Sequence, residues 1–183
     1  NNAVNCYASP SAVIEPGRVY VHFGSYGTAC LDMDGKAIWK RDDLPCRHYR
    51  GPGSSPILYK DLLILTFDGV DQQYLTALDK KTGETVWRTE RSTKWTDYDE
   101  KGQLIREGDA RKSYSTPIVV DVNGTPQVIS AGSMCAFAYD AGTGKEIWAV
   151  RYDGYTAAPM PVYGDGVAYI LSGRGKNSLN AVK

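Results

Sequence analysis

The sequence has little that would support a metal site or nucleic-acid binding. Its two histidines, His22 and His48, stand apart in the chain, and its four cysteines include no close pair of the zinc type. Lysine plus arginine equals aspartate plus glutamate, at 21 each, so no excess of positive charge favours nucleic acid or an anionic membrane. We therefore expect neither a metal site nor a nucleic-acid partner.

Long apolar runs and long amphipathic helical patterns are also lacking. We therefore expect no transmembrane segment, no coiled coil and no membrane-surface helix. The chain starts at Asn1 rather than at methionine, so a targeting signal can lie outside it. Thirteen tyrosines, 19 glycines and only three methionines are typical of an exported all-β protein.

What the sequence does contain is an internal repeat. Three times an apolar run reaches an aspartate, turns through glycine and ends on tryptophan, at residues 29–39, 77–87 and 138–148. A unit that recurs in this way is one supersecondary element, which buries its face against copies of itself. The repeat therefore predicts the architecture more directly than it predicts the activity.

Each copy of the repeat predicts a β-hairpin. The aspartate carboxylate can accept hydrogen bonds from the turn amides, and the glycine supplies the positive φ that such a short turn needs. The turn residues are Asp32 and Gly35 in the first copy, Asp79, Thr82 and Gly83 in the second, and Asp140, Thr143 and Gly144 in the third.

A second regular feature lies upstream of each hairpin, where a small residue and a proline precede an apolar strand. The prolines are Pro10, Pro56, Pro117 and Pro159. Because proline suits a strand's first residue or its edge, these pairs mark strand starts. The interval from proline to tryptophan accommodates four short strands, which predicts the four-stranded antiparallel blades of an all-β propeller.

The expected organisation is a single domain over residues 1–183, a partial β-propeller. Three complete blades are expected at about 9–39, 55–87 and 116–148, and an incomplete blade at 158–183. Propellers close with roughly four to eight blades, so we interpret the chain as part of a longer ring. The remaining blades, or a second chain, are expected to cover the exposed blade edges.

The motif Ala-x-Asp-x-x-Thr-Gly-x-x-x-Trp, complete at 77–87 and 138–148, resembles the repeat of the PQQ-like (pyrroloquinoline-quinone-like) β-propellers. The resemblance implies that Trp39, Trp87 and Trp148 dock between neighbouring blades. That family includes quinoprotein dehydrogenases and also BamB, an outer-membrane assembly propeller without enzymatic activity. The fold alone therefore cannot choose between an enzyme and a scaffold.

Loop lengths favour one face of the propeller for binding. The aspartate-to-glycine turns are uniformly short, whereas the interblade links at 40–54, 88–114 and 149–157 vary in length and lie on the opposite face. The candidate ligand residues there are Arg47, His48, Tyr49 and Arg50 in the first link and Trp95 in the second. The basic cluster suits an anionic ligand such as a carboxylate, and the alternative is a solvated link whose arginines pack on aromatic rings.

Two minor motifs also lie near these links. Cys30 and Cys46 are the only candidate disulfide, which forms if the first link folds back onto the strand before it in an oxidising compartment.

Residues 97–102 imitate the opening of a calcium loop. Lys101 holds its fifth position and Gly108 its twelfth, so we expect an exposed hairpin there rather than a calcium site.

The resemblance implies that a quinoprotein dehydrogenase would need a tryptophan platform, a calcium site, an aspartate base and a disulfide between adjacent cysteines. No cysteines here are adjacent. The leading hypothesis is therefore a non-catalytic scaffold without a cofactor, periplasmic, cell-surface or secreted in bacteria, that binds a protein or saccharide. The alternative is a PQQ-dependent alcohol or sugar dehydrogenase, with PQQ and calcium, whose catalytic blades lie outside this segment.

Overall fold

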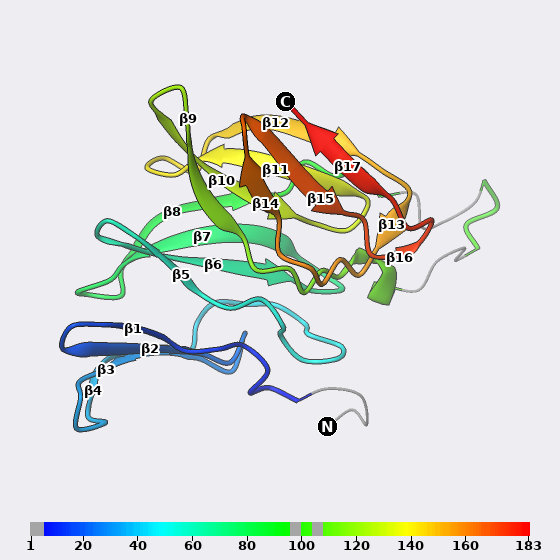
Figure 1. The fold of residues 1–183 in the computed structure, drawn as a ribbon. Helices are drawn as coiled ribbons and strands as arrows, with labels where there is room; N and C mark the ends of the chain where they lie inside the picture. The colour runs from blue at the N-terminus through cyan, green and yellow to red at the C-terminus, as the bar shows by residue number, and fades with distance from the viewer. Residues whose placement is uncertain (1–5, 96–99, 104–107) are drawn as a thin grey trace.

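A computed structural model describes residues 6–95, 100–103 and 108–183 and shows antiparallel sheets stacked one after another along the chain (Figure 1). The predicted all-β fold with propeller blades is confirmed. Blade 1 contains β1 (Val13–Glu15), β2 (Arg18–His22), β3 (Thr28–Leu31) and β4 (Ala37–Arg41). Blade 2 contains β5 (Ile57–Tyr59), β6 (Leu62–Asp68), β7 (Gln73–Asp79) and β8 (Thr85–Glu90). Blade 3 contains β9 (Ile118–Val122), β10 (Thr125–Ala131), β11 (Cys135–Asp140) and β12 (Glu146–Arg151).

Blade 4 is a three-stranded sheet of β14 (Val162–Gly164), β15 (Val167–Leu171) and β17 (Leu179–Val182). Beside it, β13 (Gly154–Tyr155) pairs with β16 (Arg174–Gly175), and a short 3-10 helix, η1 (Gly108–Arg111), lies in the link between blades 2 and 3. In blades 1 to 3 the strands pair in chain order, so each blade is an antiparallel meander.

The core lies between the blades because the inner strands are buried on both faces. Along β6, side chains alternate between the two neighbours: Leu63, Leu65 and Phe67 pack toward blade 1, and Ile64 packs toward blade 3. A third cluster, which includes Ile129 and Ile170, joins blade 3 to blade 4. Each blade therefore needs its neighbours to bury its apolar residues.

The repeated hairpins share an aspartate-held turn in all three complete blades, and the turn of blade 1 is shorter than the other two. The carboxylates of Asp32, Asp79 and Asp140 each accept hydrogen bonds from two backbone amides of their own turn. Opposite each tryptophan the ladder shifts register, after Cys30, Ala77 and Ala138 respectively. The three tryptophans therefore occupy equivalent positions on the outer strands.

The tryptophans of blades 1 and 2 dock onto the turn of the next blade. Trp39 Nε1 donates to the Lys80 carbonyl at 3.1 Å, and Trp87 Nε1 donates to the Ala141 carbonyl at 3.3 Å. The rings cover Gly83 and Gly144, where a Cβ atom would lie 2.8 Å and 2.5 Å from the ring. Both glycines also have positive φ, so no other residue fits without displacing the ring.

The loops divide between two faces. The turn face carries the tight turns at 31–37, 79–85 and 140–146. The long-loop face carries the described parts of the links at 42–56, 91–117 and 152–161, together with the loops between second and third strands at 23–27, 69–72 and 132–134. In Figure 1, η1, β13 and β16 mark the long-loop face on the right.

Candidate functional site: the long-loop face

The links of the long-loop face are tied to one another by backbone hydrogen bonds. Val70 N donates to the Arg47 carbonyl at 3.1 Å, which joins the first link to blade 2. Tyr114 N donates to the Ala157 carbonyl at 2.7 Å, and Thr156 N donates to the Lys112 carbonyl at 3.0 Å. The described parts of this face therefore form one connected surface.

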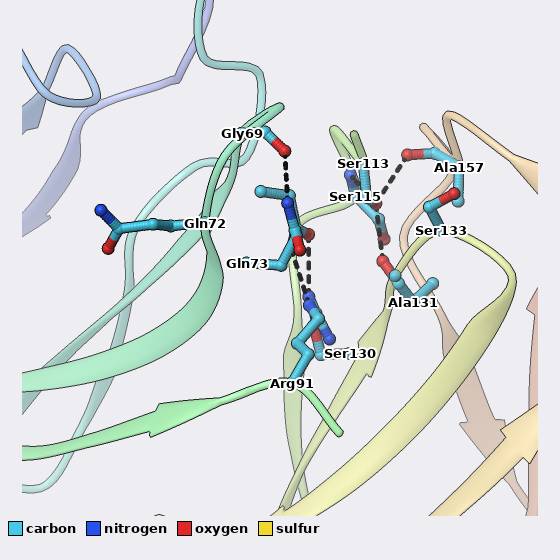
Figure 2. A network of polar contacts seen from close by, with 12 residues as sticks. Gly69, Gln72, Gln73, Arg91, Ser113, Ser115, Ser130, Ala131, Ser133 and Ala157 are labelled. Atoms are coloured by element: carbon cyan, nitrogen blue, oxygen red, sulfur yellow. Dashed lines mark hydrogen bonds and ion pairs between the residues drawn. The ribbon is translucent and has the colours of Figure 1, made fainter. Parts of the chain in front are cut away.

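A buried ion pair lies beneath this surface. Arg91 donates to both carboxylate oxygens of Asp68, at 2.7 Å and 2.9 Å, and each side chain is only 1% exposed. Arg91 also donates to Ser130 Oγ at 2.8 Å (Figure 2). Because Ser130 belongs to blade 3, this guanidinium joins blades 2 and 3.

Both members of the pair are charged. Burial alone would lower the pKa of Arg91, but the adjacent Asp68 carboxylate raises it above its usual value, so the guanidinium stays protonated. Burial raises the pKa of Asp68, and Arg91 opposes that shift. The bidentate contact to both oxygens is the geometry of an ionised carboxylate.

Further buried polar groups near Arg91 join the first, second and third interblade links. Lys112 is fully buried, and its Nζ donates to the Gly51 carbonyl at 3.1 Å. Ser113 Oγ lies within hydrogen-bonding distance of the carbonyls of Ala131 and Ala157, at 2.7 Å and 3.0 Å (Figure 2). These contacts fix the second link against the first link and blade 3.

An open pocket of about 340 Å³ lies on this face between blades 1 and 2. It is lined by Ser25 and Tyr26 from the loop of blade 1, by Cys46, Arg47, His48 and Tyr49 from the first link, and by Val70 from the loop of blade 2. The structure therefore brings three of the predicted ligand residues together. A smaller pocket of about 300 Å³ is lined by Lys94, Met134, Arg151, Tyr152 and Asp153.

The other two predicted ligand residues, Arg50 and Trp95, are not in the lining of this pocket. The Arg50 guanidinium lies 5.6 Å from the centre of the Tyr49 ring. Trp95 donates to Gln73 Oε1 at 3.0 Å, and the Arg111 guanidinium lies 5.4 Å from its ring. Of the two arginines in the first link, Arg50 packs on an aromatic ring, as the solvated-link alternative predicts, whereas Arg47 lies in the pocket lining.

Cys46 and His48 lie side by side, with Sγ 3.8 Å from Nδ1, but they do not form an activated nucleophile. Burial raises the pKa of the Cys46 thiol well above its usual value. Burial, with the Lys112 charge nearby, lowers the pKa of His48 to about 3. At neutral pH the pair is therefore a neutral thiol and a neutral imidazole, without the thiolate that nucleophilic catalysis requires.

The two histidines do not stand apart in the structure, as their separation in the sequence suggests. The rings of His22 and His48 both pack on Phe67, with ring centres 5.2 Å and 6.2 Å from it. His22 Nδ1 lies 2.8 Å from Thr28 Oγ1, and burial lowers the pKa of His22 to about 4. Both imidazoles are therefore neutral at pH 7, His22 in the core and His48 at the edge of the pocket.

The burial of His22 predicts that acid begins to destabilise the protein at pH values well above those at which carboxylates titrate. An unfolded His22 takes up a proton near pH 6.5, whereas the folded protein takes it up only near pH 4. Between these values the unfolded state binds more protons, so the free energy of unfolding falls with falling pH, by about 3 kcal/mol for His22. Urea titrations from pH 7 to pH 4 measure this slope. His22→Asn should reduce it, and an unchanged slope would contradict the assignment.

The expected disulfide between Cys30 and Cys46 does not form, because both thiols are free. Cys30 lies opposite Trp39, at the turn end of blade 1, where Trp39 contacts Lys80. Cys46 Sγ lies 3.9 Å from the Gln72 carbonyl, at the other end of β7. The 7 residues of β7 span roughly 20 Å, so the two ends of the blade lie well beyond the reach of a disulfide.

The remaining structural findings concern membranes and metals. Among the described residues no helix is long and apolar enough to cross a membrane. Within the same part of the chain, no three His, Cys, Asp or Glu side chains are grouped closely enough to hold a metal ion. Asp97 and Asp99, from the segment that imitates a calcium loop, lie outside the described residues.

The sequence did not single out Asp68, Arg91 or Lys112 as buried or functional residues of this face. Each looks in the sequence like an ordinary charged residue at a strand end or in a link, and only the fold shows that they are buried.

Comparison with known protein families identifies the family of the chain. The family model described as outer membrane protein assembly factor BamB matches residues 7–136 and 71–182. No curated protein sequence matches the chain.

Several solved structures are similar in fold. BamB from Moraxella catarrhalis has a TM-score of 0.60 and 18% identity, over 93% of this chain and 45% of that chain. Quinohemoprotein alcohol dehydrogenase from Comamonas testosteroni has a TM-score of 0.60 and 18% identity, over 88% of this chain and 32% of that one. Quinohemoprotein alcohol dehydrogenase ADHIIG from Pseudomonas putida HK5 has a TM-score of 0.54 and 16% identity, with 93% and 34% covered. The chain thus spans less than half of each of these proteins, and the likeness concerns the fold.

Proposed function

Because the chain belongs to the PQQ-like propeller family whose model is described as outer membrane protein assembly factor BamB, we propose that it is a non-catalytic propeller. In this proposal the protein binds a partner macromolecule, a protein or a saccharide, through its long-loop face. The proposed location is the bacterial periplasm or cell surface.

The observation that carries the proposal is the difference between the two faces. On the turn face, the turns of blades 2 and 3 receive the tryptophans of the preceding blades, which use the Lys80 and Ala141 carbonyls. On the long-loop face, buried polar contacts hold the links together while Tyr26 and Tyr49 remain 59% exposed beside Arg47. Tyrosine and arginine are the residues that protein interfaces favour.

A dehydrogenase is the second candidate, and the contacts of the described tryptophans and of Asp68 favour the scaffold over it. Trp87 lies in a blade-to-blade contact, Trp39 packs on the blade 2 turn, and Trp95 is held by Gln73 and Arg111. Asp68, the buried carboxylate of this face, is neutralised by Arg91 and so is not available as a base. In this proposal, therefore, none of these tryptophans serves as a quinone platform, and Asp68 does not serve as a base.

The outer sides of the first and last blades also suit further partners. Ile14 and Ile38 are exposed on blade 1, and Val162, Leu171 and Leu179 are exposed on blade 4. We propose that further blades or a second chain cover these residues, because exposed apolar sheet faces favour association.

Site-specific photocross-linking tests the proposed binding face. A benzophenone amino acid at position 49 replaces an exposed aromatic residue of the long-loop face, and the same group at Met33, which is 64% exposed, probes the turn face. We expect irradiated cells to give a discrete macromolecular adduct from position 49 and none from position 33. Equal adducts from both positions, or none from position 49, would contradict the proposed function.

A further inference from the structure

The pocket between blades 1 and 2 combines one accessible cation with aromatic walls. Arg47 is exposed, and no described carboxylate pairs with its guanidinium; its backbone N–H donates to Asp71 Oδ1 at 2.8 Å, and its carbonyl accepts from Val70 N. That same Asp71 oxygen also accepts from Gln72 N. The Arg47 side chain is therefore available to an incoming anion.

The charges around the pocket favour an acidic occupant. Arg47 is the charged side chain of the lining. The Asp71 carboxylate beside it accepts through Oδ1 from two backbone amides, and Asp68 is neutralised by Arg91. The exposed guanidinium therefore attracts an anionic group to the pocket.

One wall of the pocket is preformed, because hydrogen bonds hold the first link against blade 2 at two points. Tyr74 Oη donates to the Pro45 carbonyl at 3.0 Å, and Val70 N donates to the Arg47 carbonyl at 3.1 Å. Tyr26 Oη donates to Tyr7 Oη at 3.0 Å. A preformed wall costs a partner less ordering entropy on binding.

The chemistry of the lining suits a peptide better than a saccharide. Tyr7 already packs against the Tyr26 ring, with centroids 4.0 Å apart, and Arg50 lies beside the Tyr49 ring. A saccharide needs an open ring face and several neutral donors and acceptors. Apart from the guanidinium and the aromatic edges, the lining offers the Ser25 hydroxyl and an inward-packed neutral His48.

We propose that this pocket is a docking site for an acidic segment of a partner protein, in which an aspartate or glutamate carboxylate pairs with Arg47 and a neighbouring apolar side chain packs on Tyr26 and Tyr49. The inference rests on the proposed partner-binding function and adds the chemistry of the partner. A planar guanidinium binds a carboxylate with two parallel hydrogen bonds, which gives such a contact its specificity.

The test is an NMR titration of the protein with capped tetrapeptides. The probe acetyl-Gly-Glu-Leu-Gly-amide is compared with its glutamine counterpart, and maltotriose serves as the saccharide. We expect the glutamate peptide to shift the amides of residues 25–26, 46–49 and 70 and to bind about tenfold more tightly than the glutamine peptide. Arg47→Gln should abolish this preference. Lys36→Gln, which makes the same charge change on the turn face, should leave it intact.

Equal affinity for the two peptides, an unchanged preference in Arg47→Gln, or binding by maltotriose in place of the peptide would overturn the proposal. The cross-link from position 49 separates this outcome from failure of the broader function. If the adduct still forms equally well in the Arg47→Gln background, the long-loop face binds a partner without an acidic contact at Arg47. If no adduct forms even with Arg47 present, the partner-binding function itself fails.

Discussion

Replacing Asp68 with alanine is expected to lower the free energy of unfolding by about 3–5 kcal/mol. The variant leaves the Arg91 guanidinium buried without its carboxylate partner, since both side chains are only 1% exposed in the native protein. It also weakens the contact of Arg91 with Ser130 that joins blades 2 and 3. The loss should therefore appear as cooperative destabilisation of both blades in a urea titration.

An exposed ion pair provides the matched control for this variant. Arg41 and Asp43 approach to 2.6 Å, but the Asp43 side chain is 64% exposed. Asp43→Ala should cost at most about 1 kcal/mol, because water screens the pair. Adding Arg91→Met to Asp68→Ala removes the stranded charge and should recover part of the lost stability. If Asp68→Ala and Asp43→Ala cost the same, the pair is not buried as described.

Replacing Trp87 with alanine is also expected to lower the free energy of unfolding by about 3–5 kcal/mol. The ring is buried between blades 2 and 3 and covers Gly144. Its removal leaves a cavity between two blades that cannot collapse, because the backbone turn beneath it is held by Asp140. Thermal or urea unfolding of the purified variant measures the cost.

Two other substitutions show whether docking causes this effect. Trp39 makes the same contact but is only partly buried, so Trp39→Ala should cost less than Trp87→Ala. Gly144→Ala should also destabilise, because its Cβ would lie 2.5 Å from the Trp87 ring. A Trp87→Ala variant as stable as the parent protein would show that the tryptophans do not hold the blades together.

The blades and turns could be predicted because they repeat. The spacing from aspartate through glycine to tryptophan recurs in phase, and each turn is built from hydrogen bonds between residues close together in the chain. Local chemistry of this kind is visible in a sequence. The docking of each tryptophan on the next blade followed from the family resemblance, and the structure describes the contacts for Trp39 and Trp87.

The buried ion pair could not be predicted because it breaks the repeat. Asp68 is the last residue of the second strand of blade 2, and the equivalent positions of blades 1 and 3 hold Gly24 and Ser133. Its partner Arg91 comes from another part of the same blade, and only the fold brings them together. A charged residue that appears once has no periodic signal.

The prediction of a disulfide was wrong for a related reason. Separation along the chain allowed Cys30 and Cys46 to meet, but the first link crosses to the long-loop face before Cys46 and reaches the far end of the neighbouring blade. The same crossing places Cys46 next to His48 and brings the two histidines to one phenylalanine, Phe67. Link paths of this kind depend on side-chain contacts between blades, which the repeat does not encode.

The most direct test of the central claim, that this propeller is not catalytic, is a titration of the protein with PQQ and calcium followed by absorbance. We expect no saturable, calcium-dependent change in the quinone spectrum and no reduction of an electron-accepting dye when an alcohol is added. A saturable spectral change together with alcohol-dependent dye reduction would contradict the account and establish a dehydrogenase.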